Sequence, residues 1–144
     1  ADLIGSLSRL EGLERLLMDR NEIGELPSIG ALLNLRSLSL AHNKLVALPD
    51  DIWRLRHLKR LALQGNKVRE LQTSIGQLES LESLDLKSNS LTFLPSSIGQ
   101  LHSLKHLDVS ENQLSQLVLS ICDLAQLERI EVKNNPLQRP PLST

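Results

Sequence analysis

The chain has 144 residues, with 16 Lys and Arg against 17 Asp and Glu, and its formal net charge at pH 7 is −1. That balance argues against a nucleic-acid-binding protein, since such proteins carry a basic excess. Apolar stretches are only a few residues long, so no segment is expected to span a membrane. Thirty-five residues are Leu, whereas Trp53 and Phe93 are the two aromatic residues. Such a composition points to internal repeats.

The repeat is marked by an asparagine that follows an alternating apolar segment. Each copy reads LxxLxLxxN, with Met, Val or Ile in place of some leucines. The spacing between copies is 22 residues once and 23 residues four times. The six asparagines are Asn21, Asn43, Asn66, Asn89, Asn112 and Asn135.

Each unit combines a short strand with a return segment. The alternation in Leu84-x-Leu86 predicts a strand with one buried face, which a single unit cannot cover alone. Stacked units bury that face and pair their strands into a parallel sheet. Return segments such as LPSSIGQL, residues 94–101, predict at most one turn of 3₁₀ or α-helix on the convex side. One such set of inward residues is Leu58, Leu61, Leu63, Val68, Leu71, Ile75 and Leu78.

The repeated asparagine is predicted to be structural. After each strand the chain turns inward, which leaves backbone N–H and C=O groups inside the core. An amide side chain both donates and accepts, so each asparagine can satisfy its own unit and its neighbour. The six asparagines are therefore expected to form a ladder, not an active site.

The two ends of the array depart from the repeat. Pro136, Pro140 and Pro141 cannot continue the ladder, so the array is expected to end near residue 142. The N-terminal edge is either a cut edge or one that lacks a cap. The apolar residues before the first unit fit the closing half of a preceding unit, and they are Leu3, Ile4, Leu7 and Leu10.

The segment LPSSIGQLHSLKHLDVSENQL resembles the intracellular, 23-residue type of leucine-rich repeat. Similar repeats occur in Ras-pathway scaffolds, Scribble-like polarity proteins and plant Ras-group proteins. The ending VKNNPLQRPP is similar to the point where repeats stop in proteins that combine them with a calponin-homology domain. The resemblance implies an α/β solenoid, a right-handed superhelix with a concave parallel sheet, as one domain over residues 1–144. It also implies an intracellular, cytoplasmic location, consistent with a single cysteine and no visible signal peptide.

No group of residues predicts catalysis, a metal site or a cofactor site. His102 and His106 have i,i+4 spacing, but they fall in a return segment and on a strand, so both are interpreted as solvent-facing. Cys122 occupies the column of Gly30, Trp53, Gly76 and Gly99, and it is expected to pack against the convex turn. Trp53 itself is interpreted as convex packing, or else as an anchor of a second contact surface.

The concave face carries the candidate binding residues. Strand residues that alternate with buried ones face outward, and this predicts Leu17, Ala41, Ala62, Ser83 and Ser110 on that face together with the candidates. Five positive and four negative charges on the face suit a protein partner, not a polyanion. Small residues in the second and third units are expected to form a shallow trough. The candidates are Arg15, Asp19, Ser37, Ser39, Arg60, Gln64, Asp85, Lys87, His106, Asp108, Arg129, Glu131 and Lys133.

These features predict a monomeric, non-enzymatic recognition module. The resemblance implies a signalling partner such as a small GTPase, bound on the concave face. One alternative is a targeting domain of a larger enzyme, such as a ubiquitin ligase, kinase, phosphatase or Roco-type GTPase. Another is self-association through the N-terminal edge or Trp53. Recognition by the convex surface also stays open.

Overall fold

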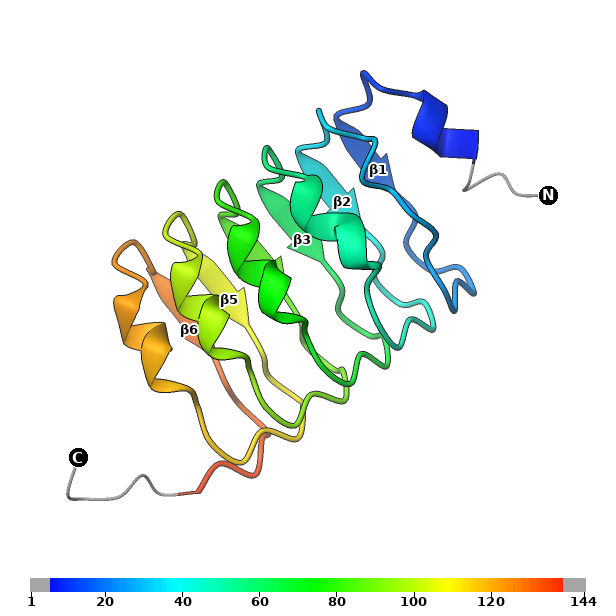
Figure 1. The fold of residues 1–144 in the computed structure, drawn as a ribbon. Coiled ribbons are helices and arrows are strands. Elements are labelled where there is room, and N and C mark those ends of the chain that lie inside the picture. The colour runs from blue at the N-terminus through cyan, green and yellow to red at the C-terminus, as the bar shows by residue number, and fades with distance from the viewer. Residues whose placement is uncertain (1–5, 139–144) are drawn as a thin grey trace.

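A computed structural model of the chain describes residues 6–138, in which short strands form one parallel sheet. The strands follow the order of the chain and pair residue for residue, so that Leu38, Leu61 and Leu84 lie side by side. Figure 1 shows the units stacked along one axis. The predicted solenoid is thereby confirmed. The strands are β1 (Arg15–Leu17), β2 (Ser37–Ser39), β3 (Arg60–Ala62), β4 (Ser83–Asp85), β5 (His106–Asp108) and β6 (Arg129–Glu131).

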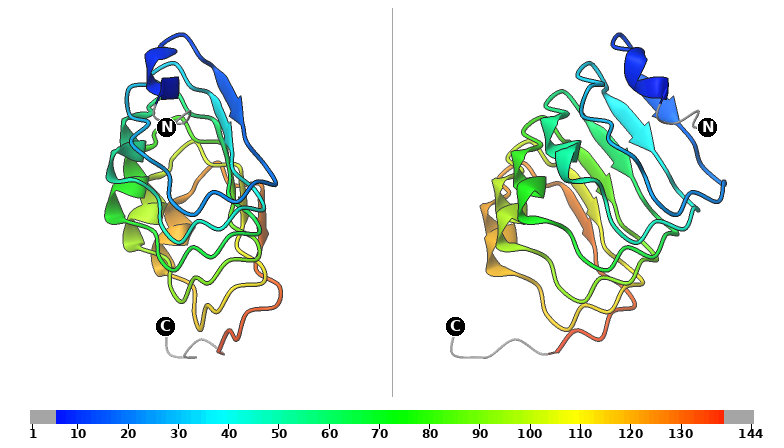
Figure 2. Two further views of the ribbon diagram at one scale, coloured as in Figure 1. Left: turned by 90° about the vertical axis from the view of Figure 1, so that its right-hand side faces the viewer. Right: turned by 45° about the vertical axis from the view of Figure 1, so that its right-hand side comes forward.

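Short 3₁₀ helices lie on the side of the solenoid opposite the sheet (Figures 1 and 2). η4 starts after Pro95, whose extended backbone (ψ 150°) leads into the turn, and ends where the N–H of Leu101 bonds to the C=O of Ile98. The predicted single helical turn is thus of the 3₁₀ type. The helices are η1 (Leu7–Arg9), η2 (Asp50–Arg54), η3 (Thr73–Gln77), η4 (Ser96–Gln100) and η5 (Leu119–Asp123).

The first return segment, residues 24–35, contains no helix, which agrees with the prediction of at most one helical turn. The spacing between Asn21 and Asn43 is 22 residues, one fewer than elsewhere. The carboxylate of Asp51 compensates: it accepts hydrogen bonds from the N–H of Gly30 (2.9 Å) and from the hydroxyl of Ser28. A side chain from the next unit therefore replaces a helical hydrogen bond in the shortened segment.

Leucine columns from successive units fill the core. The predicted inward set from Leu58 to Leu78 is confirmed, since no member exceeds 4% exposure. Full burial of such a side chain contributes about 1.5–3 kcal/mol. Burial weakens at the last strand, where Ile130 is 37% exposed. In the described part of the chain, no helix has the length and apolar character needed to cross a membrane.

The ends can be checked only in part. Leu7 packs against the core, as expected for a preceding partial unit, whereas Leu10 is 49% exposed. Leu3, Ile4, Pro140 and Pro141 lie outside the described residues, and so does the predicted end of the array near residue 142.

The asparagine ladder is present. Asn66 donates to the C=O of Leu40 in the preceding unit (2.9 Å) and of Leu63 in its own (3.0 Å), and its Oδ1 accepts the N–H of Leu45 (3.0 Å). Asn43, Asn89 and Asn112 repeat the arrangement and are buried. Asn135 bonds in the same way while partly exposed. Asn21 is exposed, and its side-chain amide donates to C=O groups of its own unit, those of Met18 and Asp19.

We expect Asn66→Ala to lower the free energy of unfolding by roughly 1–3 kcal/mol, because buried backbone groups of two units lose their partners. Chemical denaturation measures the change. Asn21→Ala is the control and should cost clearly less, because Asn21 is exposed. Equal losses for both variants would contradict the structural role of the ladder.

Candidate functional site

Parallel pairing arranges the outward side chains of the concave face in columns. The first residues of the strands form one column without an acidic member: Arg15, Ser37, Arg60, Ser83, His106 and Arg129. The third residues form a column that is apolar or small at its N-terminal end and acidic at its C-terminal end: Leu17, Ser39, Ala62, Asp85, Asp108 and Glu131. The middle residue of each strand points into the core. The register therefore places the predicted strand candidates on one face.

Two residues predicted to face outward are buried instead. Ala41 is 1% exposed and Ser110 is 5% exposed. Both follow the end of a strand, where the chain already bends toward the buried asparagine, so strict alternation no longer applies. At the equivalent position Gln64 is partly buried, and its Oε1 is enclosed without a hydrogen-bond partner among the described residues. Asp19, Lys87 and Lys133 at this position are exposed, as predicted.

Two hollows lie on the concave face, and Arg60 lines both. The first, of about 300 Å³, has Ser37, Ser39 and Ala62 in its lining, with Leu17 and Arg15 at its N-terminal side. This is the trough predicted from small residues. The second, of about 400 Å³, has a charged lining of Arg60, Asp85, His106, Asp108, Arg129 and Glu131. Asp85 also lines both hollows, so the first combines small side chains with three charged ones, whereas the second is lined mainly by charged side chains.

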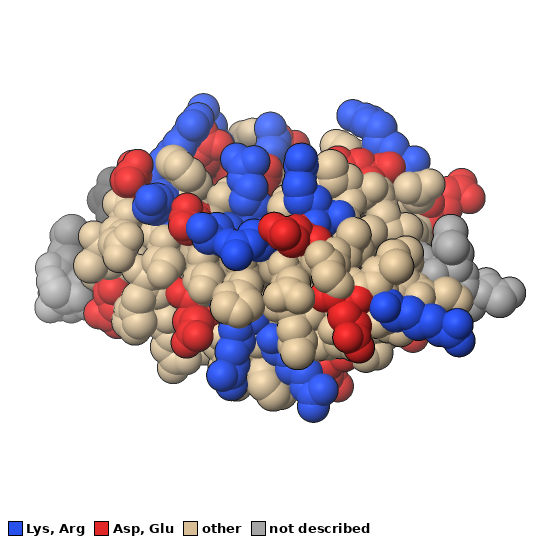
Figure 3. Space-filling model, turned by 90° about the horizontal axis from the view of Figure 1, so that it is seen from above, with Lys and Arg blue, Asp and Glu red and all other residues tan. Residues whose placement is uncertain are grey.

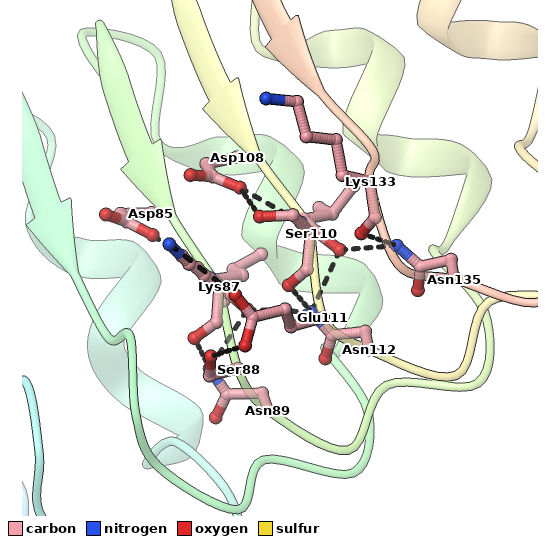
Figure 4. Close-up of polar contacts among 12 residues, drawn as sticks. Asp85, Lys87, Ser88, Asn89, Asp108, Ser110, Glu111, Asn112, Lys133 and Asn135 are labelled. Carbon is pink, nitrogen blue, oxygen red and sulfur yellow. Dashed lines mark hydrogen bonds and ion pairs between the residues drawn. The ribbon is translucent and has the colours of Figure 1, made fainter.

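Internal hydrogen bonds fix some of the candidates. Oδ1 of Asp19 accepts the Ser39 hydroxyl (2.5 Å) and the Ala41 N–H (3.1 Å). Glu111 lies 3.5 Å from Nζ of Lys87 and accepts the Ser88 hydroxyl (3.0 Å), as Figure 4 shows. Nη2 of Arg129 lies 3.3 Å from Oε1 of Glu131. These side chains are held in place before any partner arrives.

Other candidates have no side-chain hydrogen bond or ion pair within residues 6–138. These are Arg15, Ser37, Arg60, Gln64, His106 and Lys133. Arg60 lines both hollows, so its guanidinium group can donate to an acceptor presented from solvent.

The acidic column contains two carboxylates with opposite behaviour. Burial, with the negative charges of Asp108 and Glu131, raises the pKa of Asp85, although its Oδ1 accepts the N–H of Lys87 (3.0 Å). Burial also acts to raise the pKa of Asp108, but the hydroxyl (2.5 Å) and N–H (2.9 Å) of Ser110 donate to its Oδ1 and hold that pKa below its usual range. Figure 4 shows the two carboxylates on neighbouring strands. Ionisation of Asp85 therefore destabilises the folded state, whereas ionisation of Asp108 stabilises it.

Of the predictions for the remaining candidate residues, one is wrong. His102 and His106 are both exposed, as predicted, and no group of three or more possible metal ligands occurs among residues 6–138. The prediction that Cys122 packs against a convex turn is wrong, because its thiol is exposed. The next unit covers the equivalent Gly76 and Gly99, through Ser97 and Ser120, whereas no described unit follows Cys122. Trp53 is half-buried, with the guanidinium of Arg54 5.9 Å from the ring centre.

This arrangement defines a solenoid repeat protein whose exposed feature is a rigid sheet face. The model of the leucine-rich repeat family matches residues 11–68, 56–114 and 79–137. The chain therefore belongs to the leucine-rich repeat family, whose domains generally mediate protein–protein interaction. A comparison with curated proteins finds no match.

Several solved structures are similar to this chain. A leucine-rich repeat protein of Leptospira interrogans is 38% identical with a TM-score of 0.93, over 96% of this chain and 36% of that one. The internalin InlF of Listeria monocytogenes is 26% identical (TM-score 0.85), over 97% of this chain and 40% of that one. The ectodomain of the Arabidopsis thaliana receptor kinase GASSHO1/SCHENGEN3, in complex with CASPARIAN STRIP INTEGRITY FACTOR 2, is 33% identical (TM-score 0.83), over 90% of this chain and 16% of that one. This chain thus spans well under half of each.

We expect Asp85→Asn to raise the melting temperature at neutral pH. The pKa of Asp85 is raised in the folded state, so ionisation of this group costs stability, and an asparagine can still accept the N–H of Lys87. The gain should shrink as the pH falls through the pKa of Asp85, where the wild-type carboxyl becomes neutral as well.

Asp108→Asn is the matched variant with the opposite sign. Because the pKa of Asp108 is lowered, its charge stabilises the fold at neutral pH, and this stabilisation is lost as the pH falls through that pKa. Thermal melts across the acidic range measure both variants. The same sign of change for both at neutral pH would contradict the assignment.

Proposed function

We propose that the chain is a non-enzymatic recognition module that binds a protein segment across its concave face. The observation that carries this proposal is the in-register grid of outward side chains over two adjoining hollows. Parts of the grid are already fixed by internal bonds, such as Asp19 with Ser39. Binding to fixed groups costs less conformational entropy than binding to mobile ones.

The chemistry of the two hollows indicates the kind of segment. The first hollow has small residues and the 55%-exposed Leu17 beside the charged Arg15, Arg60 and Asp85, so it suits a side chain whose apolar part packs on Leu17 next to polar groups. In the second, Asp85 and Asp108 suit a cationic group. Arg60 between them suits a carboxylate or a backbone carbonyl. An extended segment with an apolar, an acidic and a basic side chain in succession would satisfy both hollows.

We further propose an intracellular, cytoplasmic setting with a signalling protein, such as a small GTPase, as the partner. Support comes from the 23-residue repeat and from the return segment LPSSIG, residues 94–99. Cys122 is an exposed free thiol, which suits a reducing compartment.

Selection of binding peptides from a displayed random library tests the concave face and does not require the natural partner. Peptides selected on the wild-type protein should bind the double variant Arg60→Glu/Asp108→Lys about tenfold or more weakly, because two charges in the hollows change sign. Fluorescence anisotropy measures the affinities.

Gln77→Lys/Gln100→Glu is the control, since these exposed residues lie on η3 and η4 of the convex side. It also keeps the net charge unchanged, as the concave variant does. If selected peptides bind the concave variant as tightly as the control, the concave face is not the binding surface.

A further inference from the structure

The third repeat unit carries a band of positive charge. Residues 52–69 contain six Lys or Arg, together with His57, and no Asp or Glu. The rest of the chain has ten Lys or Arg against 17 acidic residues. The basic residues of the band are Arg54, Arg56, Lys59, Arg60, Lys67 and Arg69.

None of these six side chains forms an ion pair within residues 6–138. The five ion pairs there use Arg36, Lys44, Lys87, Lys105 and Arg129 instead. Lys59 follows Arg36 in the column that precedes the strands, with its N–H bonded to the C=O of Arg36 (2.8 Å). Elsewhere in this column, opposite charges are paired, as in Glu14–Arg36 and Glu82–Lys105. On its other side Lys59 is followed in this column by Glu82, whose N–H bonds to the C=O of Lys59 (2.8 Å) and whose carboxylate pairs with Lys105. The basic side chains of the band are therefore left without a paired carboxylate among residues 6–138.

One part of the band borders a hollow on the flank of the solenoid. The hollow has a volume of about 450 Å³ and is lined by Leu33, Asn34, Trp53, Arg54, Arg56 and His57. Leu33 is 54% exposed, an unusual position for a large apolar side chain in this core-forming repeat. The lining therefore combines two apolar side chains with three basic ones and no acidic one.

The nearby carboxylate of Asp51 forms no ion pair with this lining among residues 6–138. Asp51 lies one turn before Arg54, but its Oδ2 accepts hydrogen bonds from Ser28 and Gly30 of the preceding unit, and its Oδ1 is buried without a hydrogen-bond partner in the described part of the chain. The guanidinium of Arg54 lies over the ring of Trp53 instead. In Figure 3, Lys and Arg side chains project near the middle of the molecule as well as toward both ends, with acidic side chains between them.

We propose that this flank hollow is a second docking surface, which binds an acidic segment of a partner protein through an apolar anchor residue. The anchor packs between Leu33 and Trp53, and flanking carboxylates pair with Arg54 and Arg56. Tryptophan and arginine are enriched among the residues that dominate binding energy at interfaces. A pure polyanion would use the charges and leave the two apolar side chains uncovered, so a protein segment fits the lining better.

Trp53 provides a direct readout, because it is the one tryptophan of the chain and tyrosine is absent. The probe is a short peptide with a central Leu flanked on both sides by Glu. Its addition should shift the Trp53 emission to shorter wavelength and do so saturably, as the ring loses contact with water. An unchanged emission spectrum would overturn the proposal without any variant.

The variant Arg54→Glu/Arg56→Glu should weaken the peptide about tenfold or more, as followed by Trp53 emission. Both side chains are exposed, so the fold is expected to persist, which circular dichroism checks. Arg9→Glu/Arg20→Glu is the matched control: it makes the same change in net charge at two exposed residues that belong to neither proposed surface. If the control variant weakens peptide binding equally, the effect comes from the overall charge of the protein, and the proposal is overturned.

Two further measurements distinguish a protein segment from a polyanion as the ligand of the flank hollow, and binding at this hollow from binding on the concave face. Replacement of the central Leu of the peptide by Ser should abolish most of the binding. If the Ser peptide or an oligonucleotide binds as well as the Leu peptide, the hollow is a polyanion site and the proposal fails. Asp108→Lys alters the concave face alone and should leave the Leu peptide unaffected, so the outcome here is independent of the concave proposal.

Discussion

Contact between neighbouring units is the constraint on which this structure depends. A three-residue strand such as β3 makes too few hydrogen bonds to persist alone, and its leucines are covered only by adjacent units. The ladder couples units more tightly still. Asn66 bonds to Leu40 and Leu45 of the unit before it, so the inward turn of one unit is completed by a side chain of the next. Stability is therefore shared between neighbours.

The same constraint creates the recognition surface. A register fixed by buried leucines leaves no freedom in which outward residues become neighbours, so Asp85, Asp108 and Glu131 must stand side by side. The resulting repulsion contributes to the raised pKa of Asp85. Ser110 stabilises the charge on Asp108 and thereby keeps the middle carboxylate available. The core thus supports an electrostatic arrangement that isolated strands would not adopt.

Repetition explains why so much of this fold was predictable. Six copies of LxxLxLxxN fix the strands, the buried columns and the ladder, because each element depends on spacing alone. The errors occur where a residue depends on a particular neighbour. Cys122 shares a column with glycines that a following unit covers, and Ala41 and Ser110 lie where the backbone has already bent. The first return segment is one residue shorter than the others and has no helix, and the spacing of Asn21 and Asn43 already contained that difference in length.

The candidate sites were predictable to different degrees. Alternation placed Arg60 and Asp108 outward, but it could not reveal that Asp19 is tied to Ser39 or that Arg60 is unpaired, since both depend on side-chain geometry. The flank hollow had a signal in the sequence: the run from Ile52 to Arg69 without an acidic residue. That signal occurs in one unit only, so a comparison that looks for residues common to all units does not detect it.

Departures from the repeat are therefore where specificity resides. The shared positions build one stiff body, and they are nearly the same in every unit. The third unit differs by its positive band, with Arg60 on the concave face and Arg56 at the flank of the same short segment. A partner that presents like charge to this unit would lose binding energy on either surface, whereas a complementary one gains on both. Charge placed on a rigid frame thus selects among partners more than it adds affinity.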